Sequence, residues 1–276
     1  YNVRSHEGLM RNVVIRCNGK GEFMVIVVIN EENGLVRNVM IPEMQKRFPE
    51  IISIMLVINN KFNDIITDLP FENVYGEECL IETMKAPREG HDDLKFRVGP
   101  VSFFQTNVYQ GERLYKAAFD LADVKGDELM YDLYTGTGTI ALYFARFVKE
   151  VVGVEYVEEA IADAKINSEF NNINNVKFYA GDMAKVFTDE FIEANGRPDF
   201  VVTDPPRAGM HEKVVEQLLK IQPKKIVYIS CNPATQARDL QLLDSLYEVK
   251  AVQPVDMFPH THHVENIVLL KLKSEN

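Results

Sequence analysis

The chain has 276 residues, of which 46% are hydrophobic, and a formal net charge of −11 at pH 7. This length predicts two domains, and because no uncharged apolar run reaches about 18 residues, we expect no membrane span. The excess of acidic residues argues against a generic polyanion binder, because affinity for phosphate comes mainly from clustered Lys and Arg. A nucleic-acid substrate would therefore need a local basic patch or a further domain.

Residues 1–100 form the first predicted domain, which is of the α+β type. Two β-branched runs at 13–17 and 22–29 flank Asn18-Gly19-Lys20-Gly21, a pattern typical of a hairpin turn. A third strand is expected at 51–58, with a short helix at about 42–48 before it. This part of the chain carries no obvious catalytic cluster.

From residue 101 the pattern changes to strands that alternate with helix-length amphipathic segments. Strands are predicted at 128–134, 151–155, 176–180, 199–203, 225–229, 247–252 and 267–271, and helices at 107–122, 139–148, 157–171, 212–219 and 235–246. This α/β alternation predicts a doubly wound, mainly parallel sheet in a second domain at 101–276. The last two strands have no convincing helix between them, so we expect an antiparallel edge pair.

A glycine turn follows the first strand of the second domain, in the sequence DLYTGTGT at 132–139. Gly136 and Gly138 allow the backbone to turn tightly and approach a ligand, and Glu155, at the end of the next strand, suits two ribose hydroxyls. The pattern fits a dinucleotide, S-adenosylmethionine, or a tight turn without a ligand. Asp132 favours S-adenosylmethionine, because a carboxylate at this place repels a pyrophosphate and suits a cationic amino group.

Two later strand exits also carry acidic side chains. Asp182 follows the third strand and is placed to bind an adenine amino group, while Asp204 opens the run Asp-Pro-Pro-Arg after the fourth strand. The two prolines hold this run extended and remove two N–H donors, so it can direct Asp204 at a planar base. Taken alone, the run would equally fit a plain turn. Open α/β sheets bind ligands outside the carboxyl ends of their strands, where these acids are expected to meet.

Cys231 stands at the end of the fifth predicted strand, in Ser230-Cys231-Asn232-Pro233. Pro233 suits the first turn of a helix, and a helix N-terminus stabilises a thiolate and lowers its pKa. We therefore interpret Cys231 as a nucleophile for covalent catalysis, with an inert core thiol as the alternative. Together with Cys17 and Cys79 it makes three widely spaced cysteines, too few for a four-thiolate iron–sulfur cluster and typical of a reducing cytosol.

Glu265 follows three histidines at 260–263 and precedes an apolar strand. Partly buried surroundings would raise its pKa and suit a general base that takes a proton from carbon, whereas the alternative is a surface glutamate. The histidine spacing fits no standard zinc pattern, so no metal site is expected.

Near the start of the second domain, Phe104 and Gln105 suit stacking on a base and hydrogen bonding to it, although paired phenylalanines usually pack in a core.

Taken together, these motifs resemble those of the S-adenosylmethionine-dependent RNA uracil-C5 methyltransferases, which make 5-methyluridine in tRNA or 23S rRNA. The matching segments follow the family's order over residues 100–276 and are Ser102-Phe103-Phe104-Gln105 with Asn107, Asp132–Gly138, Gly153-Val154-Glu155, Asp204-Pro205-Pro206-Arg207, Ser230-Cys231-Asn232-Pro233 and His263-Val264-Glu265. The resemblance implies a Rossmann-like methyltransferase domain preceded by a smaller α+β central domain that contacts RNA. A small β-barrel RNA-binding domain and the iron–sulfur cluster of some members are missing, so we expect an excised portion with reduced RNA affinity.

The resemblance also implies roles for single residues, with Cys231 as the nucleophile and Glu265 as the base. The predicted cofactor-binding residues are Gln105, Asp132, Tyr134, Gly136, Gly138, Thr139, Glu155, Asp182 and Asp204, and the predicted substrate-binding residues are Phe104, Gln105, Asp204 and Arg207. Thr139 departs from the Asn that relatives often carry at this position. We expect a cytoplasmic monomer that uses S-adenosylmethionine and acts on RNA, with 23S rRNA placed before tRNA.

The predicted reaction begins when the Cys231 thiolate adds to C6 of uracil, which makes C5 nucleophilic enough to take a methyl group. Glu265 then removes the C5 proton, and elimination expels Cys231. The uridine must leave its stack to react, so single-stranded or loop RNA is expected.

Three other classes of protein are kept as alternatives. An NAD-dependent oxidoreductase would use the same glycine turn, and a non-catalytic RNA-binding or ribosome-assembly module would retain only a vestigial pocket. An amino-group methyltransferase also carries a proline-rich loop after its fourth strand, but it has no need of Cys231 or Glu265.

Overall fold

The computed structural model describes residues 1–273, and the chain divides into two compact units. One unit comprises Tyr1–Thr83 and Arg97–Ser102, and the other comprises Met84–Phe96 and the chain from Phe103 onward. The sequence pattern placed a boundary at residue 100, whereas residues 84–96 lie in the second unit. No helix within the described range is long and apolar enough to cross a membrane.

The first unit is built on a four-stranded sheet in the order β1-β2-β3-β4. Its strands are β1 (Met10–Cys17), β2 (Phe23–Ile29), β3 (Ile51–Ile58) and β4 (Glu72–Gly76). β1 and β2 pair antiparallel, as the predicted hairpin requires, and β2 and β3 pair parallel. The connection between β2 and β3 contains a π-helix, η1 (Val36–Met40), and α1 (Ile41–Arg47), so the predicted helix is confirmed.

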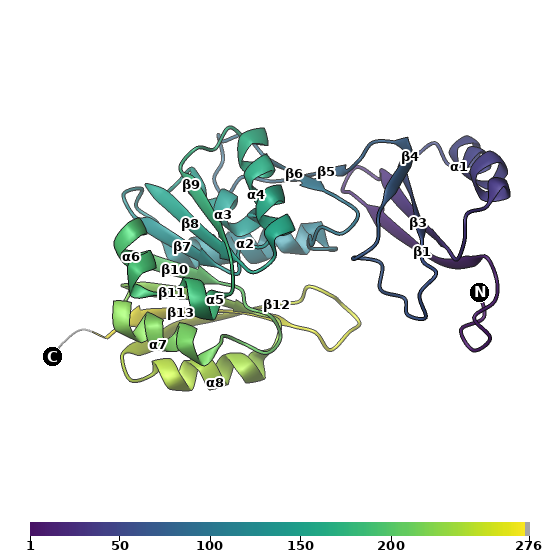
Figure 1. Ribbon diagram of the computed structural model, residues 1–276. Coiled ribbons are helices and arrows are strands. Elements are labelled where there is room, and N and C mark those ends of the chain that lie inside the picture. The colour runs from purple at the N-terminus through teal and green to yellow at the C-terminus, as the bar shows by residue number, and fades with distance from the viewer. Residues whose placement is uncertain (274–276) are drawn as a thin grey trace. The chain divides into compact units, whose positions relative to one another are not determined.

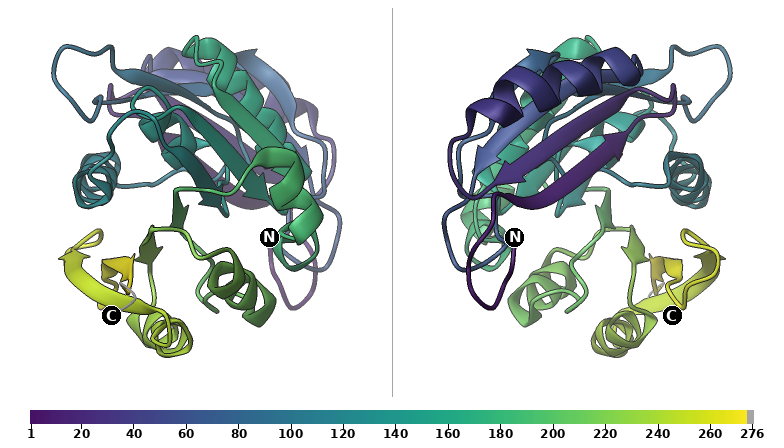
Figure 2. Two further views of the ribbon diagram at one scale, coloured as in Figure 1. Left: turned by 90° about the vertical axis from the view of Figure 1, so that its left-hand side faces the viewer. Right: turned by 90° about the vertical axis from the view of Figure 1, so that its right-hand side faces the viewer.

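The core of this unit lies between the sheet and the η1–α1 segment. Alternate residues of β2, from Val25 to Ile29, pack with Ile54 and Leu56 of β3 and with Val36 and Ile41 of the helices. The right-hand view of Figure 2 shows the purple helical segment lying along the purple strands. The period of two along the strands thus places one apolar face under the helix.

The second unit contains a seven-stranded sheet in the order β12-β13-β11-β10-β7-β8-β9 (Figure 1). Its strands are β7 (Leu129–Leu133), β8 (Glu150–Glu155), β9 (Val176–Ala180), β10 (Phe200–Thr203), β11 (Lys225–Ser230), β12 (Tyr247–Val255) and β13 (Glu265–Leu272). The five strands β7 to β11 are parallel, while β13 runs antiparallel to both β11 and β12. The predicted doubly wound sheet and its antiparallel final pair are confirmed. Two short strands, β5 (Leu80–Met84) and β6 (Leu94–Val98), pair separately.

Helices cover both faces of the seven-stranded sheet. They are α2 (Val108–Ala122), α3 (Thr139–Ala145), α4 (Glu158–Phe170), α5 (Met183–Val186), α6 (Asp189–Asn195), α7 (Glu212–Ile221) and α8 (Pro233–Leu243). On one face, Tyr131 of β7 and Tyr228 of β11 share a core cluster with Leu218 of α7 and Leu243 of α8. Figure 2 shows the yellow strands β12 and β13 next to the yellow-green helix α8.

The opposite face of the same sheet is covered by α2 and α3. The ring of Phe119 on α2 lies 5.1 Å from that of Phe144 on α3, which lies 6.2 Å from Phe200 of β10. The chain proceeds from β7 to β8 and β9 on one side and returns to β10 and β11 on the other. The strand order therefore reverses between β7 and β10, and a crevice is expected at their carboxyl ends.

Candidate functional site

The turn between β7 and α3 depends on left-handed backbone conformations. Tyr134, Gly136 and Gly138 have φ angles of 67°, 55° and 80°. A Cβ on Gly138 would lie 3.0 Å from Cβ of Ala164 and 3.0 Å from Cζ of Phe178. Glycine at 138 thus allows α3 to begin against α4 and β9, and it directs the first turn of α3 toward the sheet edge.

Asp132 lies beneath this turn and is fully buried. Its Oδ2 accepts a hydrogen bond from the Thr135 hydroxyl at 2.5 Å, while Oδ1 has no hydrogen-bond partner among the described residues. Burial raises the pKa of this carboxyl group to about 7. A buried acceptor without a partner is costly, and it favours a ligand that brings a donor or a positive charge.

Glu155 connects the end of β8 to the glycine turn. One carboxylate oxygen accepts the Gly136 N–H at 3.1 Å, and the other accepts the N–H groups of Tyr156 and Val157 at 2.8 and 3.1 Å. Asp182 occupies the equivalent place after β9, where it caps α5 by accepting the Ala184 N–H at 3.0 Å. Both predicted acids therefore accept hydrogen bonds from backbone N–H groups at the ends of neighbouring strands.

A cavity of about 660 Å³ opens beside these strand ends. Tyr134, Tyr156 and Asp182 line it together with the loop after β10 and residues of α8. Burial raises the pKa of the Tyr134 phenol to about 12, an increase that the backbone of His211 partly offsets. The cavity thus joins the glycine turn to the Asp-Pro-Pro-Arg loop within one unit.

Asp204 and Glu265 come from two strands on the other side of the crevice. Asp204 follows β10, where its N–H donates to the Leu133 carbonyl of β7 at 3.3 Å, and Glu265 begins β13. Burial, then Glu265 and then Asp132 raise the pKa of Asp204 well above its usual value. Burial raises the pKa of Glu265, which Arg207 partly offsets. The fold thus brings together the buried Asp132 and the half-buried Asp204 and Glu265, and a cationic ligand would be stabilised beside them.

Cys231 lies half-buried directly before Asn232, the N-cap residue of α8. Burial raises the pKa of its thiol, as do Glu265 and Asp204, while the Arg207 guanidinium acts in the opposite direction. The prediction that the helix N-terminus lowers this pKa is therefore wrong in direction. Burial and the two carboxyl groups raise this pKa, and the Ala234 N–H at the start of α8 is already bonded to the Asn232 side chain at 3.2 Å.

The Asp-Pro-Pro-Arg loop is held in place by α8. The Arg207 carbonyl accepts hydrogen bonds from Asn232 at 3.0 Å and from the Thr235 hydroxyl at 3.1 Å. Farther along α8, the buried carboxylate of Asp239 accepts the Met210 N–H at 2.8 Å and the Tyr228 hydroxyl at 2.6 Å. Sequence reasoning missed this role of Asp239. The available signal was an acidic residue on the apolar face of a predicted helix.

Gln105 and Phe104 occupy different surroundings. Gln105 is half-buried, and its stem lies against Gly111 of α2, where an added Cβ would be 3.3 Å from the Cβ of Gln105. Phe104 is buried, with its ring 5.6 Å from that of Phe96, so it packs in the core and is not available to stack on a base. The neighbouring Phe103, which is 71% exposed, is the accessible aromatic of this segment.

Thr139 is the remaining predicted cofactor-binding residue. Thr139 begins α3, with its hydroxyl 3.4 Å from that of Thr137. The rings of His262 and His263 pack at 4.2 Å. Within residues 1–273, no group of three His, Cys, Asp or Glu side chains is arranged to hold a metal ion.

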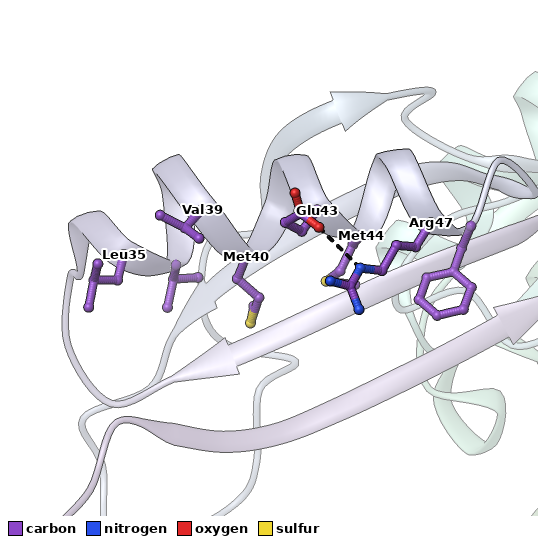
Figure 3. Close-up of a pocket in the computed structure, with 8 residues that line it drawn as sticks. Leu35, Val39, Met40, Glu43, Met44 and Arg47 are labelled. Atoms are coloured by element: carbon purple, nitrogen blue, oxygen red, sulfur yellow. Dashed lines mark hydrogen bonds and ion pairs between the residues drawn. The ribbon is translucent and has the colours of Figure 1, made fainter.

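Another cavity, of about 480 Å³, follows η1 and α1 in the first unit (Figure 3). Its wall is mainly apolar, with Leu35, Val39 and Met40 among the residues that line it. The charged side chains Glu43 and Arg47 pair with each other at 3.1 Å. This groove has the character of an apolar surface, and the groups suited to chemistry lie in the crevice of the second unit.

Comparisons with known proteins match nearly the whole chain. The family described as tRNA (uracil-5-)-methyltransferase matches residues 78–273. A protein from Bacteroides thetaiotaomicron named an uncharacterized RNA methyltransferase is 54% identical over 99% of this chain and 59% of its own length. A protein of the same name from Porphyromonas gingivalis is 50% identical over 100% of this chain and 58% of its own length. The crystal structure of the Pyrococcus abyssi tRNA (uracil-54, C5)-methyltransferase with S-adenosyl-L-homocysteine has a TM-score of 0.80 and 34% identity, over 98% of this chain and 62% of that one.

Proposed function

The chain belongs to the tRNA (uracil-5-)-methyltransferase family, and from this membership we propose that it transfers a methyl group from S-adenosylmethionine to C5 of a uridine in RNA. The observation that carries the proposal is that Cys231, Glu265 and Asp204 lie at one edge of the sheet, where β10, β11 and β13 pair side by side. These side chains come from three strand ends, and each acid appears among the groups that raise the pKa of the Cys231 thiol. A nucleophile beside a buried acid–base group is the arrangement that covalent catalysis needs.

The residues of the crevice fit S-adenosylmethionine better than a dinucleotide. The unpartnered Oδ1 of Asp132 suits the cationic amino group, and the cavity beside Tyr156 and Asp182 has room for the adenosine portion. A pyrophosphate at the same turn would face the buried Asp132 and Glu155 carboxyl groups. When bound, S-adenosylmethionine supplies an activated methyl group, and the rest of the chemistry falls to the side chains of this chain.

Cys231 begins the proposed reaction. Its sulfur forms a bond to C6 of uracil, and the electrons of the C5–C6 double bond move toward O4, which makes C5 nucleophilic. Arg207, whose positive charge lowers the pKa of the thiol, favours the thiolate against the two carboxyl groups. After methylation, Glu265 takes the C5 proton, the double bond re-forms, and the C6–S bond breaks to release the Cys231 thiolate.

A transfer assay with a labelled methyl donor and unmethylated RNA tests this function. The wild-type chain should label RNA at 5-methyluridine, while Cys231→Ala should retain binding of S-adenosylhomocysteine and transfer no methyl group. Glu265→Gln should accumulate RNA joined covalently to protein, because the adduct keeps its C5 proton. Appreciable turnover by Cys231→Ala would remove the mechanism.

The RNA substrate is decided by running the assay with tRNA and 23S rRNA in parallel. We propose 23S rRNA first, as the sequence predicted, and tRNA as the alternative that the Pyrococcus abyssi relative favours. Because the chain spans about three-fifths of the length of its curated relatives, the whole protein is assayed beside it. Mapping the label to one RNA identifies the substrate class.

A further inference from the structure

Tyr109 and Arg113 form an exposed aromatic and cationic pair in the first turns of α2, and the mechanism above uses neither of them. Tyr109 is 62% exposed, and Arg113 is exposed as well. The guanidinium carbon of Arg113 lies 4.2 Å from the centroid of the Tyr109 ring, and its Nη2 donates a hydrogen bond to the phenol oxygen. Because the two residues are four apart on the helix, they share one face and make a flat, positively charged surface, the Tyr109–Arg113 platform.

Gln110 fixes the platform to a neighbouring loop. Its side-chain oxygen accepts a hydrogen bond from Nη1 of Arg113 at 3.3 Å, while its side-chain nitrogen donates to the Asp256 carbonyl at 2.9 Å. Asn107, the N-cap residue of α2, donates its side-chain amide to the Met257 carbonyl at 2.9 Å. The first turn of α2 is therefore bonded at two places to the loop that follows β12.

This loop places the platform at the edge of the sheet where the proposed base lies. Asp256 directly follows Val255, which pairs with Glu265 across β12 and β13. Paired Cα atoms of antiparallel strands are at most about 5.5 Å apart and consecutive Cα atoms about 3.8 Å, so the Cα atoms of Asp256 and Glu265 lie within about 10 Å of each other. A nucleic-acid strand rises about 3.4 Å per nucleotide, so this span corresponds to a few nucleotides.

The contacts that hold Arg113 leave its charge available. Its hydrogen bonds go to the neutral side chains of Tyr109 and Gln110. Lys116, one turn farther along α2, differs because its ammonium group is bonded to the Asp120 carboxylate at 2.6 and 2.7 Å. In a chain with a net charge of −11, an exposed guanidinium held by neutral partners is suited to a phosphate group, which it can bind through two N–H donors.

We propose that the Tyr109–Arg113 platform binds single-stranded RNA beside the active site, with the Tyr109 ring stacked on a base near the target uridine and Arg113 on an adjoining phosphate. This inference rests on the proposed function, which takes RNA as the substrate. A uridine that leaves its stack deprives the neighbouring base of a partner, and an aromatic ring can replace that partner. Stacking of this kind tolerates every base, so the platform contributes affinity and not sequence preference.

A binding assay without methyl transfer tests the role of the ring. The probe is a short single-stranded RNA with one uridine between two 2-aminopurine bases, whose fluorescence falls when they stack on an aromatic ring. The wild-type chain should bind and quench this probe, whereas Tyr109→Ala should bind it about tenfold more weakly and quench it less at saturation. Tyr109→Phe keeps the ring and should restore the quenching. Both side chains of the platform are exposed, so these variants should fold as the wild type does.

Phe170→Ala is the matched control for the ring. Phe170 is exposed and ends α4, which begins after the carboxyl end of β8 and so ends at the opposite edge of the sheet. This variant loses an exposed aromatic side chain far from the platform, and its affinity for the probe should equal that of the wild type.

Arg113→Gln tests the role of the charge. Loss of one phosphate contact on a single strand should reduce the slope of log affinity against log salt concentration by about 0.7. Lys116→Gln removes a positive charge from the same helix and should keep the wild-type slope, because Lys116 is paired with Asp120.

Failure of this inference is distinguishable from failure of the proposed function. No binding of the probe by the wild type, or equal affinities for the wild type, Tyr109→Ala and Arg113→Gln, would overturn the platform. If the wild type binds the probe through the platform but methylates no RNA, the proposed function fails and the RNA-binding surface stands.

Discussion

Asp132 is a single residue whose burial makes folding stability depend on pH. Its pKa is raised by burial from 3.8 to about 7, so between these pH values the unfolded chain loses a proton that the folded chain keeps. Folding stability therefore falls as pH rises through this window and is flat above it. A raised pKa of this size corresponds to a loss of up to about 4 kcal/mol in the free energy of unfolding above this window.

Asp132→Asn should remove this pH dependence. At pH 8 the variant should be more stable than the wild type by up to about 4 kcal/mol, whereas at pH 4 the two should differ little. The same variant should bind S-adenosylhomocysteine more weakly, because the proposed acceptor for the amino group loses its charge. Urea unfolding between pH 4 and pH 8 checks the first expectation, and identical pH slopes for the two proteins would contradict it.

The two glycines of the turn offer a matched pair for a second test. Gly138→Ala should destabilise the chain by about 2 to 5 kcal/mol, because a left-handed residue with a side chain is strained and its Cβ meets Ala164 and Phe178 at 3.0 Å. Gly136→Ala carries only the backbone strain of about 1 to 2 kcal/mol, since no atom lies within 4 Å of its added Cβ. If urea unfolding shows equal losses of stability for the two variants, the contacts of the added Cβ at Gly138 do not contribute to the loss.

The sequence indicates which polar residues stand at the ends of strands, but it does not indicate what surrounds them in the fold. The sequence indicated Cys231, Glu265 and Asp204, because polar residues after apolar runs are visible in one dimension. It did not indicate that two of these acids would raise the pKa of the Cys231 thiol, which depends on distances across three strands. It also placed Phe104 at a ligand, whereas the ring is buried, because burial of an aromatic ring depends on what covers it.

At the scale of elements, α8 and the loop after β10 act together. Asn232 uses its side chain twice, since its oxygen caps the helix and its nitrogen holds the Arg207 carbonyl. The loop therefore keeps its course only when the helix begins at Pro233. The apolar runs that became β7 to β11 were predictable from sequence. The short α5 and α6 were not, because a helix of about one or two turns leaves too little periodicity to detect.

Asn232→Ala should affect both stability and the proposed reaction. Loss of the cap should cost about 0.5 to 2 kcal/mol, and loss of the bond to Arg207 should slow methyl transfer. Thr188→Ala removes a comparable cap from α6, where the hydroxyl accepts the Phe191 N–H at 3.4 Å, and serves as the control. If both variants lose similar stability and both keep full transfer rates, the loop does not depend on α8 for its function.

At the scale of the whole chain, the two units carry separate hydrophobic clusters. One cluster joins β2 and β3 to η1 and α1, and the other joins the seven-stranded sheet to α7 and α8. The sequence predicted this division from the change in strand–helix pattern. It could not predict that residues 84–96 belong to the second unit, because that return of the chain depends on tertiary contacts.

Ligand binding should therefore stabilise the chain unevenly. With S-adenosylhomocysteine at about 100 times its dissociation constant, mass action predicts about 2.7 kcal/mol of added stability for the unit that binds it. Hydrogen exchange should slow at the glycine turn, at the end of β8 and across the strands of the seven-stranded sheet. Amides of β2 and β3 should exchange as before, because their core is formed within the first unit. Equal slowing of hydrogen exchange in β2, β3, β7 and β8 would contradict this expectation. It would show that the whole chain unfolds as one cooperative body, so that the measurement could not assign the ligand to the second unit.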